Sequence, residues 1–164
     1  LRGLNPDPEA RFHVDTNGSL LTHDYIDELV NAGMTDIGID LKALETATFM
    51  QITGLQDKDL AEQYKETAWE AVKYLVHNYS GKVFVGVGIP YNQSLVSTSE
   101  VSRAGERLLT IDPLIQVTLI NYRSEFRSRI IIPPDDEMKR LRDVLKDIGL
   151  KTVLCQTARG YIGP

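Results

Sequence analysis

Short apolar runs alternate along the chain with longer amphipathic segments, and this alternation predicts the secondary structure. Runs rich in β-branched residues indicate strands, and apolar residues at helical spacing indicate helices. The expected strands cover residues 11–15, 36–41, 82–89, 115–121 and 152–156. The expected helices cover residues 22–32, 46–52, 59–79, 98–110 and 134–148.

Strands that alternate with helices predict an α/β fold with a parallel sheet, because parallel neighbours need crossover connections. Runs such as residues 83–89 lack polar alternation, which is typical of strands covered on both faces. Pro90 should end the third strand, and Thr98 or Ser99 should cap the helix that follows. Spacing alone leaves open whether the sheet is doubly wound or an arc of a barrel.

Composition narrows the class of protein. The chain has 164 residues, 42% of them hydrophobic and 25% charged, which suits a single globular domain. No apolar run approaches the roughly 20 residues of a membrane span. The single cysteine, Cys155, excludes an intrachain disulfide framework and favours a reducing compartment such as the cytoplasm. The start at Leu1 without an initiator methionine suggests part of a longer protein.

Charge argues weakly against nucleic acid as a partner. The net charge is −5, whereas non-specific nucleic-acid binding usually needs a basic surface. One local exception is a run of three arginines within seven residues, namely Arg123, Arg127 and Arg129. A solvated loop explains this run about as well as a binding role does.

Two short polar motifs end the first two expected strands. Residues 15–18 read Asp-Thr-Asn-Gly, and residues 40–42 read Asp-Leu-Lys. One expected helix separates the strands, so parallel pairing would place both motifs at the same edge of the sheet. Ligand sites of α/β folds lie beyond this carboxyl edge. The two motifs therefore predict a polar ligand site.

Strand alternation predicts that a polar face adjoins this edge. Side chains at every second position of a strand share one face of the sheet. The residues placed on this face are Arg11, His13, Asp15, Gly38, Asp40, Lys42, Phe84, Gly86, Gly88, Gln116, Thr118, Ile120 and Tyr122. A sheet that served only as core would have little use for this combination of polar side chains and glycines. We therefore favour a concave ligand site over a structural polar layer.

Each candidate residue also has a simpler interpretation. Asp15 could cap the turn that follows it, and Asp40 could pair with Lys42 along the strand. His13 is expected to be a hydrogen-bonded interior histidine rather than a ligand. Cys155 is expected to be a small buried hydrophobe. The spacing of His, Cys and carboxylate residues forms no metal motif, and no glycine-rich loop matches a nucleotide fingerprint.

The strand ends, taken in order, resemble those of the radical S-adenosylmethionine (SAM) superfamily, and of the pyruvate formate-lyase activating enzyme group in particular. The similar segments are 15–18 (Asp-Thr-Asn-Gly), 36–42 (Asp-Ile-Gly-Ile-Asp-Leu-Lys), 52–54 (Ile-Thr-Gly), 83–90 (ending in Ile-Pro), 118–122 (Thr-Leu-Ile-Asn-Tyr) and 149–154 (Gly-Leu-Lys-Thr-Val-Leu). They span nearly the whole chain. Each segment is short, so their order and spacing carry the resemblance.

The resemblance implies a partial parallel (β/α) barrel of about five strands with covering helices, with residues 1–164 as one domain from its C-terminal part. In the family, a Cys-x3-Cys-x2-Cys loop binds a [4Fe-4S] cluster, and a Gly-Gly-Glu motif holds the amino group of SAM. This chain contains neither motif, and Cys155 cannot replace three thiolates. We expect the missing segment upstream and no activity from this chain alone.

The resemblance also implies roles for individual residues. Asp15, Thr16 and Asp40 correspond to positions at the methionine end of SAM that also help bind a monovalent cation. Arg123 falls where activating enzymes have a histidine that contacts SAM, and Val85 stands where they have an arginine. The cofactor-binding residues implied for this chain are Asp15, Thr16, Asn17, Asp40, Lys42 and Arg123.

The implied activity is that of an oxidoreductase. The reduced cluster cleaves SAM to methionine and a 5′-deoxyadenosyl radical, which abstracts a hydrogen atom from the substrate. For activating enzymes the substrate is a backbone glycine of a glycyl-radical enzyme, and a flavodoxin or ferredoxin supplies the electron. Three alternatives stay open: a radical SAM enzyme acting on RNA or a small molecule, a non-catalytic nucleotide- or protein-binding domain, and a barrel enzyme for a phosphorylated metabolite.

Overall fold

In the part of the chain that the structure describes, residues 7, 9–123 and 130–164 of a computed structural model, six strands form one sheet. The strands, in both chain order and spatial order, are β1 (His13–Thr16), β2 (Asp36–Asp40), β3 (Phe84–Tyr91), β4 (Gln116–Asn121), β5 (Thr152–Thr157) and β6 (Gly160–Ile162). Neighbours from β1 to β5 pair in parallel, and β6 pairs antiparallel with β5.

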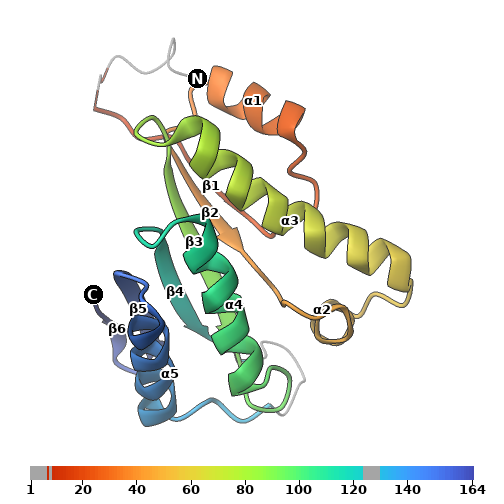
Figure 1. Cartoon of the computed structure of the whole chain (residues 1–164), viewed down its shortest axis with the longest axis vertical. Helices are drawn as coiled ribbons and strands as arrows, with labels where there is room; N and C mark the ends of the chain where they lie inside the picture. The colour runs from red at the N-terminus through yellow and green to blue at the C-terminus, as the bar shows by residue number, and fades with distance from the viewer. Residues whose placement is uncertain (1–6, 8, 124–129) are drawn as a thin grey trace.

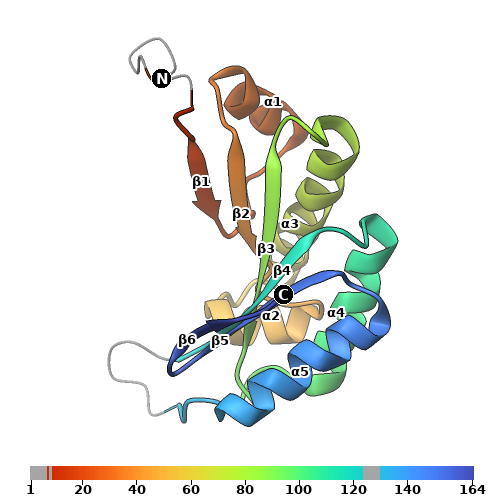
Figure 2. The ribbon, with the colours of Figure 1, turned by 90° about the vertical axis from the view of Figure 1, so that its left-hand side faces the viewer.

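Helices cover one face of this sheet. The helices are α1 (His23–Asn31), α2 (Thr46–Thr53), α3 (Lys58–Tyr79), α4 (Thr98–Ile111) and α5 (Asp135–Ile148). Figures 1 and 2 show α1, α3, α4 and α5 on the same side of the strands, and no described helix lies on the opposite side. The predicted α/β class and the partial parallel (β/α) barrel are therefore confirmed, and β6 adds one strand to the expected set.

The core lies between the sheet and these helices. Its fully buried members come from the strands and from the facing helix stripes and include Ile37, Ile39, Val117, Leu119, Val153, Val72, Leu75, Leu108 and Leu145. Trp69 of α3 is also buried, and its indole N–H donates to the Ala43 carbonyl at 3.1 Å. The Arg107 guanidinium of α4 lies 4.4 Å from the centroid of the Trp69 ring. The face of the sheet that packs against the helices is thus apolar.

Two expected helix boundaries have different outcomes. Thr22, the first residue of the expected helix 22–32, is the N-cap of α1, and its hydroxyl accepts from the backbone N–H of Tyr25. The expectation that Thr98 or Ser99 caps α4 is wrong, because Ser97 holds that position and accepts from Glu100 N at 3.1 Å. Residues 97–100 read Ser-Thr-Ser-Glu, a capping-box pattern that marks the correct cap.

Pro90 does not end the third strand, contrary to the prediction. β3 continues to Tyr91, and Pro90 pairs in register with Ile120 of β4. The carbonyl of Gly88 faces β2, where it accepts from Leu41 N, so the backbone at Pro90 faces the same side. β2 ends at Asp40, and the missing N–H of Pro90 therefore costs no bond between strands.

Cys155 is buried on β5 as predicted, and burial raises the pKa of its thiol. Arg127 and Arg129, from the arginine run, lie outside the described residues. Among the described helices, none is long and apolar enough to cross a membrane.

A cluster of hydrogen bonds joins α1 to α3. The Asp27 carboxylate accepts from the Tyr74 hydroxyl at 2.9 Å and from the Tyr79 hydroxyl at 2.5 Å. His23 stacks on the Tyr74 ring with the centroids 3.9 Å apart. Hydrogen bonds from Tyr79 and Tyr74 lower the pKa of Asp27, and the same bond raises the pKa of Tyr79 to about 12.

This cluster predicts a pH dependence of stability. The lowered pKa of Asp27 contributes stability above its unfolded value of about 3.9, and acidification removes that contribution. The raised pKa of Tyr79 contributes stability below about pH 10, and this is lost as the pH rises toward 12. In Asp27→Asn we expect Tyr79 to ionise at lower pH, as measured by the ultraviolet absorbance of tyrosinate. Glu28→Gln, at an exposed position of the same helix, should leave that ionisation unchanged, and an equal shift in both variants would contradict the assignment.

Candidate functional site

The two polar motifs meet at one edge of the sheet, as predicted. Asp15 pairs in register with Gly38, and Thr16 with Ile39, so the strands end side by side. The turn after β1 is closed by Thr16, whose hydroxyl accepts from Gly18 N, and by Asn17, whose amide oxygen accepts from Ser19 N. Asp15 is therefore not the residue that caps this turn, and its carboxylate is available on the sheet face.

Gly18 sets how closely this turn approaches the helix layer. Its φ is +74°, a conformation that residues with a Cβ rarely adopt. A Cβ at this position would lie 2.7 Å from the Cβ of Ala68 on α3. The glycine lets the turn pack directly against α3 and fixes where β1 ends.

A hollow of about 200 Å³ lies on the face of the sheet that no described helix covers. We call this feature the concave hollow. Its lining residues come from the first four strands: His13, Asp15, Ile37, Gly38, Ile39, Asp40, Phe84, Gly86, Val87, Gly88, Gln116, Thr118 and Ile120. Most of the residues that alternation placed on the polar face are among them, so the structure brings that face together.

Glycines on β2 and β3 make room for the two carboxylates. Asp15 is opposite Gly38, and a Cβ on Gly38 would lie only 2.5 Å from the Asp15 carboxylate. Asp40 is opposite Gly88, where an added Cβ would collide with the Asp40 carboxylate. Each aspartate thus lies over the glycine of the next strand. This close approach explains why glycine occupies those two positions.

Each carboxylate has a basic neighbour on its own strand face. Lys42 Nζ lies 2.8 Å from Asp40 Oδ2, as the simpler interpretation of this pair expected. His13 Nε2 lies 2.9 Å from Asp15 Oδ1. The prediction of an interior histidine is wrong, because the His13 side chain is 49% exposed at the first position of β1. Both pairs are open to solvent and can exchange these contacts for a ligand.

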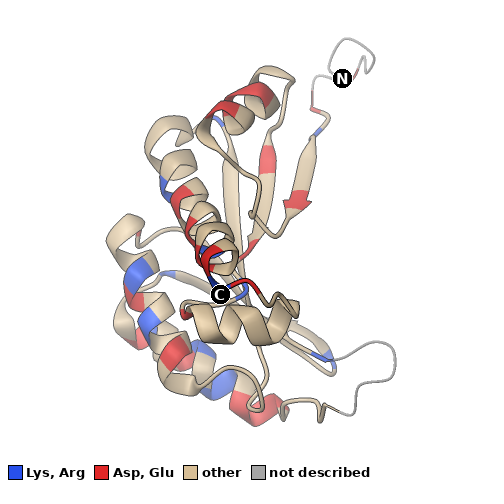
Figure 3. Ribbon diagram, turned by 90° about the vertical axis from the view of Figure 1, so that its right-hand side faces the viewer, with Lys and Arg blue, Asp and Glu red and all other residues tan. Residues whose placement is uncertain are grey.

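A third carboxylate, Asp36, lies at the opposite end of β2 and is already engaged. It accepts from the Arg11 guanidinium at 2.5 Å and from the Thr35 hydroxyl at 2.6 Å. Burial raises the pKa of Asp36, but the hydrogen bonds from Thr35 and Arg11 outweigh burial and hold that pKa below its ordinary value. Figure 3 shows acidic positions on the first two strands and both signs of charge over the helices.

The implied cofactor-binding residues are only partly assembled. Asp15 and Asp40 line the concave hollow. Lys42 does not line it but donates a hydrogen bond to the Asp40 carboxylate. Thr16 and Asn17 lie in the turn beyond β1, and Asn17 is exposed. Arg123 is exposed just beyond the end of β4 and does not line the hollow. No contact in the described part of the chain joins Arg123 to the aspartates.

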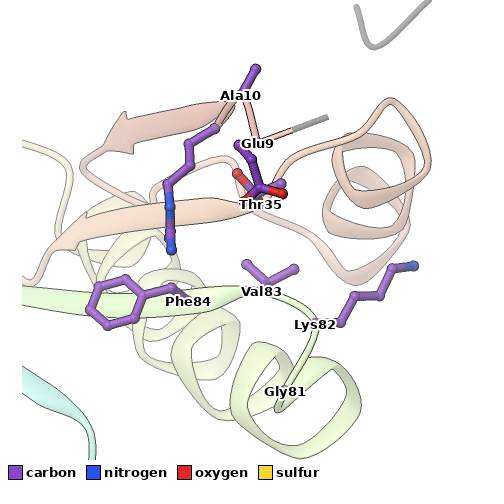
Figure 4. A pocket seen from close by; sticks show the side chains of 8 residues that line it. Glu9, Ala10, Thr35, Gly81, Lys82, Val83 and Phe84 are labelled. Atoms are coloured by element: carbon purple, nitrogen blue, oxygen red, sulfur yellow. The ribbon is translucent and has the colours of Figure 1, made fainter. Parts of the chain in front are cut away.

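A larger hollow, of about 460 Å³, lies at the amino-terminal edge of the sheet (Figure 4). Its charged groups do not converge on one point. Arg11 is bound to Asp36, and the Lys82 side chain points away from the neighbouring side chains toward the ring of Tyr79. Ligand sites of parallel sheets lie at the carboxyl ends of the strands. We therefore place the candidate site at the concave hollow despite its smaller volume.

Sequence reasoning missed two buried polar residues near this edge. Asn92 follows β3 and is fully buried, and Glu100 lies in the first turn of α4 and is 3% exposed. Both had a local signal: Asn92 stands two residues before a serine, as in an Asx turn, and Glu100 completes the capping-box pattern. Neither signal reveals the long-range partners that the structure gives these side chains.

The described residues do not fit an iron–sulfur cluster. They contain no group of three or more His, Cys, Asp or Glu side chains that could hold a metal ion. The single thiol of Cys155 is buried on β5 and faces the core. A cluster of the family's kind would need thiolates from outside this chain.

The comparisons with known proteins agree with this fold. No family model matches the chain, and no curated protein shows significant similarity to it. Among solved structures, the chain is similar to a domain of pyruvate-formate lyase-activating enzyme from Bacteroides vulgatus ATCC 8482. The TM-score is 0.68 at 15% identity, over 90% of this chain and 81% of that one. At this identity the likeness establishes a shared fold, that of an activating-enzyme domain.

Proposed function

We propose that this chain is the C-terminal part of a radical SAM oxidoreductase of the activating-enzyme kind, and that residues 1–164 supply one wall of its SAM site. One observation carries the proposal. Asp15 and Asp40, toward the carboxyl ends of β1 and β2, lie over glycines of adjacent strands in one hollow of a fold shared with an activating-enzyme domain. A structural polar layer would not need two solvent-accessible carboxylates in that hollow.

The chemistry of the residues suits the methionine end of SAM, which carries an ammonium, a carboxylate and a sulfonium. The carboxylates of Asp15 and Asp40 would hold the cationic groups, and Lys42 and Arg123 would hold the carboxylate. The Thr16 hydroxyl and the Asn17 amide would add polar contacts at the turn. SAM, once bound, supplies the radical precursor. The same oxygens of Asp15, Thr16 and Asp40 would suit a monovalent cation.

Partners follow from the same proposal. The cluster thiolates would come from a segment outside this chain, so we assign no reaction step to the residues described here. A glycyl-radical enzyme would be the substrate protein, and a flavodoxin or ferredoxin would be the reductant, in the cytoplasm. If the domain is instead a non-catalytic SAM-binding module, it would bind SAM in the same place without cleaving it.

The first test is the affinity for SAM. In the complete protein that contains this chain, we expect Asp40→Ala to weaken SAM binding about ten- to a hundredfold, as measured by titration calorimetry. The loss of one charge-assisted hydrogen bond, worth about 1.5–3 kcal/mol, sets this range. Asp24→Ala, which removes an exposed carboxylate of α1, is the control. Equal SAM affinity in wild type and Asp40→Ala would show that Asp40 pairs with Lys42 and does not bind the ligand.

A second measurement separates the enzyme from the binding module. After anaerobic iron–sulfur reconstitution, the complete protein should form 5′-deoxyadenosine from SAM under reduction. SAM binding without this product, with an intact cluster seen spectroscopically, would favour the non-catalytic module.

A further inference from the structure

Asn92 is the most fully engaged side chain near the carboxyl edge of the sheet. It is 0% exposed and lies directly after β3. Its amide nitrogen donates to the Tyr122 carbonyl at 3.0 Å and to the Ile131 carbonyl at 2.9 Å. Its amide oxygen accepts from the backbone N–H of Ser94 at 3.0 Å and from the Ser94 hydroxyl. Both donors and the acceptor oxygen are therefore used.

These bonds fix the backbone that leads to Arg123. The N–H of Tyr122 donates to the Tyr91 carbonyl at 3.0 Å, and the carbonyl of Tyr122 accepts from Asn92. Tyr122 is thus held at both of its backbone polar groups, although it lies beyond the last residue of β4. Arg123 follows immediately, so the point at which it leaves the sheet is set by Asn92.

The same amide holds the chain where it returns. Ile131 accepts from Asn92, and two residues later the Pro133 carbonyl accepts from Asn121 Nδ2 at 3.4 Å. Only a side chain with two N–H donors on one planar group and an acceptor beside them can make the bonds of Asn92. A carboxylate has no donor, and a hydroxyl has one.

We propose that Asn92 is a positioning residue that fixes where Arg123 stands at the rim and thereby places this cation for a carboxylate of the bound ligand. The second half of this proposal rests on the proposed function, because it takes the ligand to be SAM. The first half concerns the protein alone and has its own measurement.

Limited proteolysis tests the anchoring. Trypsin cleaves after arginine, and an extended, loosened backbone is cut faster than a fixed one. We expect Asn92→Ala and Asn92→Asp to raise the rate of cleavage after Arg123 at least tenfold, as followed by mass spectrometry of the fragment that ends there. Ser94→Ala, which removes only the hydroxyl that orients the Asn92 amide, should give a smaller rise and covers the case in which the other variants fail to fold. Asn78→Ala, at an exposed asparagine of α3, is the matched control.

A double-mutant cycle on SAM affinity tests the positioning role in the complete protein. We expect Asn92→Asp and Arg123→Ala each to weaken SAM binding about tenfold, and the double variant to be no weaker than Arg123→Ala alone. Such non-additivity distinguishes action through Arg123 from a general loss of stability, which would add to the effect of Arg123→Ala.

The outcomes are separable. Unchanged cleavage after Arg123 in folded Asn92 variants would overturn the anchoring. Additive losses of affinity, or no loss in Arg123→Ala while Asp40→Ala binds weakly, would overturn the positioning role and leave the proposed function standing. If neither the wild type nor any variant binds SAM, both the proposed function and the role of Arg123 toward the ligand are wrong. Faster cleavage after Arg123 in the Asn92 variants would still support the anchoring.

Discussion

Replacing Glu100 by alanine should lower the free energy of unfolding by about 3 kcal/mol. Glu100 is 3% exposed, and one of its carboxylate oxygens accepts from the backbone N–H groups of Leu44 and Glu45, each at 2.9 Å. The other oxygen accepts from the Thr48 hydroxyl at 2.8 Å. These donors lie at the start of α2, which has no side-chain cap of its own. Glu100 therefore caps α2 from α4, and alanine would leave three donors without this partner, among them the hydroxyl of the buried Thr48.

Two further variants make the measurement specific. Glu100→Gln keeps an oxygen for the two backbone donors and loses the charge, so it should cost less than alanine. Glu106→Ala removes an exposed glutamate of the same helix and should change stability by no more than about 0.5 kcal/mol. Urea denaturation followed by circular dichroism gives all three values. A Glu100→Ala loss no larger than that of Glu106→Ala would show that the capping bonds contribute little.

Gly88→Ala should destabilise the chain by about 1–3 kcal/mol, whereas Gly86→Ala should be nearly neutral. The two glycines are two residues apart on β3 and face the same hollow. A Cβ on Gly88 would collide with the Asp40 carboxylate and lie 2.8 Å from Ile120 Cδ1. For a Cβ on Gly86 the nearest atom would be a ring carbon of Phe84 at 3.7 Å. The two variants thus add the same methyl group and differ only in the atoms that it would contact.

The same pair tests the hollow as a ligand site. The added methyl of Gly88→Ala would push the Asp40 carboxylate away from Lys42, so SAM affinity should fall about tenfold or more, as for a lost charge-assisted bond. Gly86→Ala adds the same methyl group to the hollow but leaves Asp40 in place, so it measures the effect of the added volume alone on SAM affinity. Equal stability and equal affinity in the two variants would contradict the close approach of Asp40 to Gly88.

The layout of the fold could be predicted because buried parallel strands leave a strong local signal. Strand β2 reads Asp-Ile-Gly-Ile-Asp, and its apolar positions all face the helices. Period-two alternation then placed Asp15, Asp40 and Gln116 on the other face without any knowledge of contacts. The short β6 has no comparable signal, since three residues that include a glycine show no period.

Features that depend on distant partners could not be predicted. Pro90 stays within β3 only because β2 ends at Asp40, which is a matter of relative strand length. His13 is exposed because it lies on the face of the sheet that no described helix covers, as does the exposed Phe84 of the interior strand β3. Glu100 serves α2, which is more than fifty residues away along the chain. Each of these features depends on which part of the sheet or which helix lies next to the residue. The local sequence pattern carries no information about this tertiary packing.

The junction of Trp69 with Ala43 gives the protein an internal optical probe. Residues 1–164 contain one tryptophan, so the tryptophan emission of this chain comes from a single place. That indole is bonded to the backbone just after Asp40 and Lys42 and lies under the guanidinium of Arg107. A ligand that shifts the segment after β2 would change the surroundings of this one fluorophore, so events at the rim can be followed without any attached dye.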